Sequence, residues 1–297
     1  MMSLFDGLSA FPLTPADLAG KVQGDLLATF VERLSSAGVN SIGLLGSTGG
    51  YAYLSRRQRY RAVMAAVEAV RGETPIIVGV GALRTDEAEM LAREARVAGA
   101  DGLLLAPVSY LPLTDEEVFI HFTSVAGAGE LPLCIYNNPG TTKFVFSDAL
   151  IARLSRVANI VAVKMPLPAD GDYAGELSRL RAMTPEGFAI GYSGDWGAAE
   201  ALQGGCDCWY SVVAGLLPKA AMRLTVAARN GKQTEADKMN NAFGPLWVLF
   251  KEFGSFRVMY AIAQHLGFKD LVPPRPILPI TADGQRRLAT ALHDLAA

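Results

Sequence analysis

Short, nearly unbroken apolar runs recur along the first three quarters of this 297-residue chain, and a segment with helical spacing usually follows each of them. The runs comprise residues 41–46, 75–79, 102–106, 131–136, 160–164, 188–192 and 208–212, and residues 7–13 form a first strand before them. Unbroken apolar runs are typical of parallel strands that are buried on both faces. Most of them start 27 to 34 residues apart, which is the length of one strand with its crossover helix.

Eight such units predict an α/β fold, a closed (β/α)8 TIM barrel, with an open doubly wound sheet as the alternative. After Asn230 the pattern contains helices only. The helical segments there span residues 233–251, 256–266 and 283–295. We therefore expect a barrel over residues 1–230 that carries the active site, and a C-terminal helical extension over residues 231–297 that packs on the barrel.

Charge and hydropathy exclude two kinds of partner. Lys and Arg number 27 against 29 Asp and Glu, so the chain has no cationic excess to neutralise a nucleic acid backbone or an anionic membrane surface. No window reaches the roughly 18 apolar residues of a membrane span, and the first residues lack the pattern of a secretion signal. We expect a cytoplasmic protein that binds neither nucleic acid nor membrane.

The cysteines and histidines do not have the spacing of a metal site or a redox motif. They are Cys134, Cys206, Cys208, His121, His265 and His293. A CxxC, HxH or HxxxH pair is missing, so a metal centre or a Ser-His-Asp site would have to be assembled from distant single residues. The sequence therefore predicts buried free cysteines, no metal and no cofactor.

Lys164 is the first candidate for chemistry, because the active centre of a (β/α)8 barrel lies at the carboxyl ends of its strands. It ends the run 160–164 and is the only charged residue between Arg156 and Asp170. Loss of hydration in apolar surroundings favours the neutral amine, which attacks a carbonyl carbon and forms a Schiff base. The alternative is a lysine whose ammonium extends to the barrel rim.

Tyr136 ends the neighbouring run 131–136. Adjacent parallel strands lie about 5 Å apart, so its phenol and the Lys164 amine can point into the same mouth. A phenol beside an amine can carry the amine's proton. The alternative is a half-buried core tyrosine whose hydroxyl needs only one partner.

The segment Gly46-Ser-Thr-Gly-Gly50 follows the second run. Its glycines allow a sharp turn that presents backbone N–H groups, and Ser47 and Thr48 add hydroxyls, so the loop can hold a carboxylate or a phosphate. The full phosphate-loop spacing is missing, and a plain tight turn is the alternative. Gly194 is likewise expected mainly to form a turn, and a contact with the ligand is its second expected role.

Four motifs occur together along the chain. They are Gly-Ser-Thr-Gly at 46–49, Tyr-Asn-x-Pro-Gly at 136–140, Val-x-Val-Lys at 161–164 and Ser-Gly-Asp at 193–195. In this order and spacing the chain resembles the dihydrodipicolinate synthase / N-acetylneuraminate lyase family. The resemblance covers nearly the whole chain, from Ala10-Phe-Pro-Leu-Thr14 to the helical tail. Each motif is modest alone, and four in register are specific.

The resemblance implies a class I, aldolase-type lyase that acts on a small 2-oxo acid. Lys164 would form an imine with pyruvate or a longer 2-oxo acid, and the protonated imine would draw electrons from the neighbouring C–C or C–O bond. Tyr136 resembles the family's proton shuttle, and Ser47 the hydroxyl that links this tyrosine to a second one. Thr48 aligns with the residue whose backbone holds the carboxylate, and Tyr210 with a position that borders the pyruvate site.

The resemblance also implies an assembly. In the family a second tyrosine reaches across a subunit interface from the loop after the fourth strand. Tyr110 is the candidate, and Ser109 is the alternative because the register is open by one residue. A homotetramer built as a dimer of dimers is implied in the same way.

Two positions depart from the family pattern. Dihydrodipicolinate synthases have an arginine after the Tyr-Asn-x-Pro turn that grips the aldehyde substrate's carboxylate; here Thr141 stands there, and Lys143 is not an equivalent bidentate donor. Gly50 replaces a glutamate. We therefore favour a sugar-acid-like or other 2-oxo acid, processed by aldol cleavage, condensation or dehydration.

Three alternatives stay open for this site. The first is an authentic 4-hydroxy-tetrahydrodipicolinate synthase with a different carboxylate anchor. The second is a non-catalytic barrel that binds a 2-oxo acid. The third places pyridoxal phosphate on Lys164, which the sequence disfavours because no phosphate site is evident after the last strands.

Overall fold

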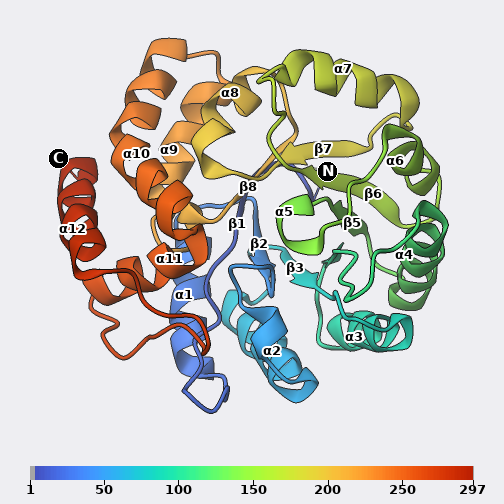
Figure 1. Cartoon of the computed structure of the whole chain (residues 1–297), viewed down its shortest axis with the longest axis horizontal. Helices are drawn as coiled ribbons and strands as arrows, with labels where there is room; N and C mark the ends of the chain where they lie inside the picture. Colours follow the sequence, from blue (N-terminus) through green and yellow to red (C-terminus); the bar gives the residue numbers. More distant parts are fainter. Residues whose placement is uncertain (1–3, 297) are drawn as a thin grey trace.

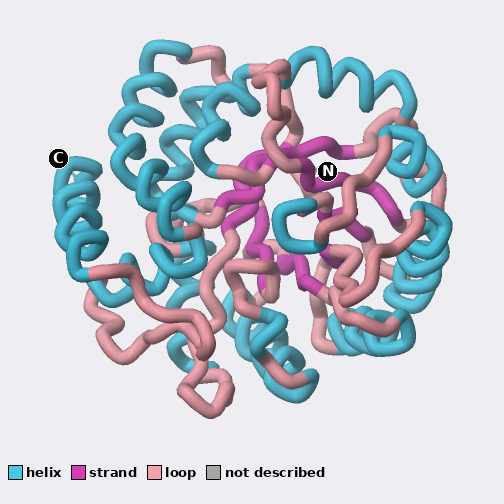
Figure 2. The backbone as a smooth tube through the Cα atoms, viewed as in Figure 1, coloured by secondary structure: helices cyan, strands magenta, loops and turns pink. Residues whose placement is uncertain are grey.

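Eight parallel strands close into a barrel in chain order, and β8 pairs back onto β1. They are β1 (Gly7–Ala10), β2 (Ser41–Leu44), β3 (Ile76–Gly79), β4 (Gly102–Leu105), β5 (Leu133–Tyr136), β6 (Ile160–Met165), β7 (Ala189–Tyr192) and β8 (Cys208–Ser211). The computed structural model describes residues 4–296, and Figure 2 shows its strands as a central ring surrounded by helices. The closed barrel confirms the predicted fold class and excludes the open sheet.

Helices follow the strands around the outside of the ring (Figure 1). They are α1 (Gly24–Ser36), η1 (Tyr51–Tyr53), α2 (Arg56–Val70), α3 (Thr85–Val97), α4 (Asp115–Gly129), α5 (Pro139–Thr142), α6 (Asp148–Leu154), α7 (Tyr173–Met183), η2 (Asp195–Gly197), α8 (Ala198–Gln203), η3 (Val213–Gly215) and α9 (Pro218–Arg229). Local side-chain chemistry sets some of their starts. Thr114 and Glu117 form a reciprocal capping box at the start of α4, and Ser147 accepts a hydrogen bond from the backbone of Leu150 in α6.

Three more helices form the C-terminal extension, α10 (Gln233–Phe253), α11 (Ser255–His265) and α12 (Ala282–Ala296). Helix α10 packs against α8 and α9, and α12 packs against α10 and α11, so the extension lies along one side of the barrel (Figure 1). Among the described helices, none is long and apolar enough to cross a membrane. The division into two units at residue 230 stays a prediction.

Inward-facing positions alternate along each strand and build layers inside the barrel. Cys134, Ala162 and Cys208 lie in a lower layer of small buried side chains. The positions two residues further on form the layer at the carboxyl ends, which therefore holds Tyr136, Lys164 and Tyr210. All three cysteines are buried and free, as the sequence predicted.

Candidate active site

Lys164 lies at the carboxyl end of β6 with only 3% of its surface exposed. Its Nζ lies 4.1 Å from the ring centroid of Phe11, 4.3 Å from that of Tyr136 and 5.5 Å from that of Tyr210. Among residues 4–296 the amine has neither a hydrogen-bond acceptor nor a carboxylate partner. The amine therefore sits unpaired in a cage of three aromatic rings, and the alternative of a lysine extending to the rim does not describe it.

Tyr136 is the direct neighbour of Lys164 across the β5–β6 ladder. Its hydroxyl accepts a hydrogen bond from Asn138 Nδ2 at 2.9 Å, and it lies 3.3 Å from Ser47 Oγ. The structure thus brings together Lys164, Tyr136 and Ser47, three residues singled out from the sequence. The connected hydroxyls give a path along which a proton can move to and from the phenol.

The loop after β2 is held in a tight conformation. Leu45 has a φ of 55°, and a Cβ on Gly49 would lie 2.8 Å from the Leu45 nitrogen, so this position needs a glycine. Within the described part of the chain, the backbone N–H groups of Ser47 and Thr48 have no hydrogen-bond acceptor. Two free donors beside the Tyr136 hydroxyl form a site that suits a carboxylate.

Tyr210 lies in β8, and its phenol is fully buried below the amine. Its hydroxyl contacts Cys134 Sγ at 3.4 Å, and burial raises the pKa of both the phenol and the thiol well above their usual values. Both groups therefore stay protonated at neutral pH. Tyr210 faces Lys164 with its ring and directs its hydroxyl toward the lower layer.

Two glycines make room for the rings around the amine. A Cβ on Gly43 would lie 2.3 Å from Phe11 Cζ, and a Cβ on Gly191 would lie 2.7 Å from Tyr210 Cε2. Phe11 and both glycines were not predicted from the sequence as parts of the site. Phe11 lies directly after β1, so inspection of all eight strand ends would have found it.

Gly194 shapes the turn after β7. Its φ of 98° suits glycine, and a Cβ would lie 2.9 Å from Leu167 Cγ. The next residue, Asp195, is buried and accepts hydrogen bonds from Trp209 Nε1 at 2.9 Å and from two backbone N–H groups of the β8–η3 turn. Burial raises the pKa of Asp195, and these hydrogen bonds oppose that shift. The contacts support Gly194 as a turn residue; its role in substrate binding stays a prediction.

Tyr110 and Ser109 do not join the site within their own chain. Tyr110 is 92% exposed, and the Ser109 hydroxyl donates to the Leu111 carbonyl. The assignment of either residue to a neighbouring subunit's site stays a prediction.

The stretch after Tyr136 has no free cation directed at the mouth. Thr141 is exposed and bonds back to the Asn138 carbonyl at 3.3 Å, and Lys143 Nζ donates to the Gly140 carbonyl at 3.0 Å. These groups are engaged locally within α5. Neither group can make the bidentate contact of the arginine that the family pattern has at the position of Thr141.

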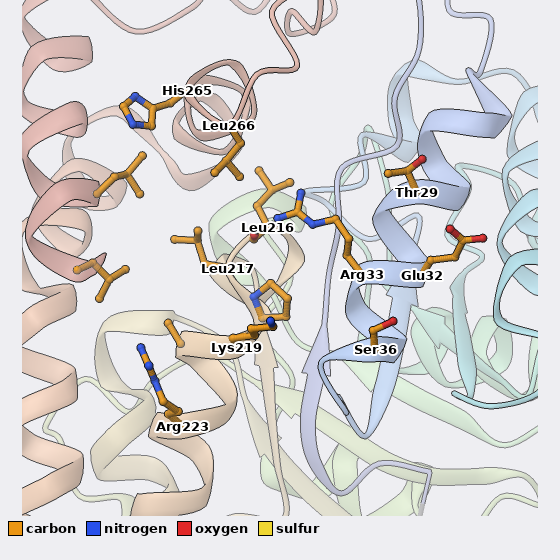
Figure 3. A pocket seen from close by; sticks show the side chains of 14 residues that line it. Thr29, Glu32, Arg33, Ser36, Leu216, Leu217, Lys219, Arg223, His265 and Leu266 are labelled. Carbon is orange, nitrogen blue, oxygen red and sulfur yellow. Dashed lines mark hydrogen bonds between the residues drawn. The ribbon is translucent and has the colours of Figure 1, made fainter. Parts of the chain in front are cut away.

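The protein also has a cavity of about 900 Å³ among its outer helices (Figure 3). It lies between α1, the start of α9, the end of α11 and α12, and residues such as Arg33, Lys219 and His265 line it. None of the residues around the Lys164 amine contributes to this cavity. Its size therefore says nothing about the chemistry at Lys164.

A (β/α)8 barrel with an unpaired lysine amine and a hydrogen-bonded phenol at the catalytic end has the architecture of a Schiff-base-forming lyase. Comparisons with known proteins agree. The dihydrodipicolinate synthetase family model matches residues 4–295. The chain therefore belongs to this family, and it is a class I lyase.

Relatives with assigned names are similar over most of their length. The 4-hydroxy-tetrahydrodipicolinate synthase of Pseudomonas aeruginosa is 32% identical over 274 residues, which cover 91% of this chain and 90% of the relative. The enzyme of the same name from Thioalkalivibrio sulfidiphilus is 33% identical, over 99% and 98% of the two chains. The crystal structure of a dihydrodipicolinate synthase from Agrobacterium tumefaciens is 57% identical with a TM-score of 0.97, and 98% of each chain is covered.

Proposed function

We propose that the enzyme binds a sugar-acid-like or other 2-oxo acid through a Lys164 imine and carries out aldol cleavage, condensation or dehydration at the neighbouring carbons. The observation that carries this proposal is the unpaired Lys164 amine, 4.1 Å from the Phe11 ring and 4.3 Å from the Tyr136 ring. An amine without ion pair or hydrogen bond has neither of these interactions to break before it attacks a ketone.

The proposed steps use the residues at the mouth. The Lys164 amine adds to C2 of the 2-oxo acid, and Tyr136 carries one of the amine protons to the former ketone oxygen. A second proton, delivered through the same phenol, lets this oxygen leave as water and completes the protonated imine. In aldol cleavage the electrons of the C3–C4 bond then move into the protonated imine, which becomes an enamine. The C4 hydroxyl passes its proton to the Tyr136 oxygen as the aldehyde leaves, and the enamine then takes a proton at C3. Water finally hydrolyses the imine, which releases the shortened 2-oxo acid and frees the Lys164 amine.

Binding of the substrate carboxylate falls to the loop after β2. The free N–H groups of Ser47 and Thr48 support this role. Ser47 Oγ would also pass protons to the Tyr136 hydroxyl, 3.3 Å away. Tyr210 would close the floor under the imine with its ring.

The second substrate distinguishes two candidate functions. Thr141 and Lys143 are hydrogen-bonded to nearby backbone carbonyls, so neither is free to bind the carboxylate of an aldehyde substrate. This supports a sugar-acid-like substrate. The names of the relatives favour 4-hydroxy-tetrahydrodipicolinate synthase as the second candidate.

A direct assay separates these candidates. Purified enzyme is given pyruvate with aspartate semialdehyde, and separately a panel of 2-oxo sugar acids, with Lys164→Ala as the control for each reaction. We expect turnover with a sugar acid at least tenfold faster than condensation with aspartate semialdehyde. Faster condensation with aspartate semialdehyde would instead favour 4-hydroxy-tetrahydrodipicolinate synthase. Binding without any turnover would favour the non-catalytic barrel.

We further propose a homotetramer in which Tyr110 reaches the mouth of a neighbouring subunit. The 92% exposure of Tyr110 supports a role outside its own chain. Sedimentation equilibrium gives the assembly state. If Tyr110→Phe leaves kcat and KM unchanged, the proposed role of Tyr110 is wrong.

A further inference from the structure

A second phenol, that of Tyr51, lies close to the mouth and has no role in the steps above. Tyr51 starts η1 directly after Gly50, which has a φ of 64°. Its ring stacks under the guanidinium of Arg59, whose Cζ is 5.2 Å from the ring centroid. The chain therefore turns sharply after the carboxylate loop and places this ring against a buried cation.

The position of Gly81 locates the Tyr51 hydroxyl. Ile77 belongs to the cluster that fills the barrel interior, and Gly79 and Gly81 follow on the same face of the extended chain. A Cβ built on Gly81 would thus point inward, and it would lie 3.6 Å from the Tyr51 oxygen and 3.2 Å from Val108 Cγ2. Val108 packs on the interior cluster that includes Tyr136. The Tyr51 oxygen therefore lies at the inner rim of the mouth, above β3 and β4.

The Tyr51 hydroxyl is free to bind a ligand. Among the described residues it has no hydrogen-bond partner, although most of its ring is covered. Burial and the nearby Tyr136 phenol raise the pKa of Tyr51 to about 12, against the opposing effect of Arg59. At neutral pH the group is therefore a hydrogen-bond donor.

Arg59 explains how the ring is fixed. Its side chain is 6% exposed and donates to the backbone carbonyls of Gly79 at 2.8 Å and Gly81 at 3.1 Å. Burial lowers its pKa to about 10, so it stays charged at neutral pH. The guanidinium thus binds the end of β3 and also packs against the Tyr51 ring, so it fixes the position of the ring relative to the strand.

We propose that Tyr51 is a specificity-determining residue that donates a hydrogen bond to a hydroxyl oxygen of the substrate beyond C3. This inference rests on the proposed imine at Lys164 and names the substrate class as hydroxylated 2-oxo acids. In this proposal a single substrate molecule would contact the amine, the free N–H groups of the Ser47 loop and the Tyr51 hydroxyl. Pyruvate ends at the C3 methyl group and has oxygen only on C1 and C2, so it would not use the Tyr51 contact.

The test is the substitution Tyr51→Phe, which removes one oxygen that bonds to nothing in the protein. The matched control is Tyr53→Phe in the same 3-10 helix, where the ring is 43% exposed and stacks on Phe256. For each protein, borohydride trapping gives the concentration of pyruvate and of 2-keto-3-deoxygluconate that half-saturates the adduct on Lys164. Thermal melting checks the fold.

We expect Tyr51→Phe to raise the half-saturating concentration of 2-keto-3-deoxygluconate about tenfold, as loss of one substrate hydrogen bond does. The value for pyruvate and the melting temperature should not change, and Tyr53→Phe should match the wild type throughout. Equal shifts for both acids, no shift, or an adduct with pyruvate alone in the wild type would overturn the role of Tyr51. Failure of the wild type to form an adduct with either acid would instead overturn the Lys164 imine.

Discussion

Tyr136 and Lys164 lie directly opposite each other on β5 and β6, and the lysine Nζ is 4.3 Å from the centre of the phenol ring. The backbone N–H of the next residue, Asn137, donates to the Lys164 carbonyl at 3.0 Å and extends the ladder past the pair. The ladder therefore fixes the spacing of the two groups. A general acid held this close to an amine can serve every proton transfer of imine formation.

Tyr136→Phe tests this relationship. The ring stays and the hydroxyl leaves, so the cage around the amine persists while the path to Ser47 is broken. We expect kcat to fall about 100-fold or more, the usual loss when a positioned acid or base is removed. Steady-state kinetics with the best 2-oxo acid measures it, and a fall of less than threefold would remove Tyr136 from the mechanism.

Gly43→Ala tests the packing behind the amine. The new methyl group would lie 2.3 Å from Phe11 Cζ, so the ring must move away from its place near Lys164. Overpacking of this kind costs about 1–3 kcal/mol of the free energy of unfolding, and imine trapping should slow as the cage opens. Urea unfolding and the rate of borohydride trapping give the two values.

A control for that substitution lies in α4. Gly127 is exposed, and an added Cβ meets no atom of the described residues within 4 Å. Gly127→Ala should therefore stabilise the protein by about 0.5–1 kcal/mol and leave trapping unchanged. If Gly43→Ala and Gly127→Ala had the same free energy of unfolding and the same trapping rate, the space beside Phe11 would not be needed.

His121 in α4 makes stability depend on pH. Burial lowers its pKa below the usual value, its Nδ1 lies 2.9 Å from Thr85 Oγ1, and its Nε2 has no hydrogen-bond partner among residues 4–296. The unfolded chain binds a proton at about pH 6.5 that the folded chain takes up only at lower pH. The free energy of unfolding should therefore fall as the pH drops below about 6.5.

Urea unfolding at about pH 7.5 and at about pH 5.5 measures that loss. We expect His121→Gln, which keeps a hydrogen-bonding side chain near Thr85, to lose less stability on acidification than the wild type. His293→Gln on the exposed side of α12 is the control and should follow the wild type. A His121→Gln profile parallel to that of the wild type would contradict the assignment.

The strands were predictable because both of their faces are buried, which leaves the unbroken apolar runs visible in the sequence. Their ends are less so: β5 starts at Leu133, two residues after the run begins, because Pro132 has no N–H for the ladder. Lys164 and Tyr136 followed from their places at strand ends. Phe11 also lies at a strand end, but its contact with Gly43 was not predictable, since it joins two strands and depends on the size of a missing side chain.

Tyr51 and Arg59 were also beyond sequence analysis. Both come from segments that follow the strand ends, and neither belongs to a motif of the family resemblance. Their contact results from the sharp turn after Gly50 and from two backbone carbonyls at the strand end that need hydrogen-bond donors. Such relations appear only when the barrel closes.

The proposed mechanism depends on a covalent bond between the Lys164 amine and a 2-oxo acid. Borohydride reduction in the presence of pyruvate, followed by intact mass and peptide mapping, measures it most directly, with Lys143→Ala as a control that keeps the site. We expect one pyruvate-sized adduct per chain on the peptide that carries Lys164, and none in Lys164→Ala. An adduct on a different lysine, or no adduct in the wild type, would contradict it.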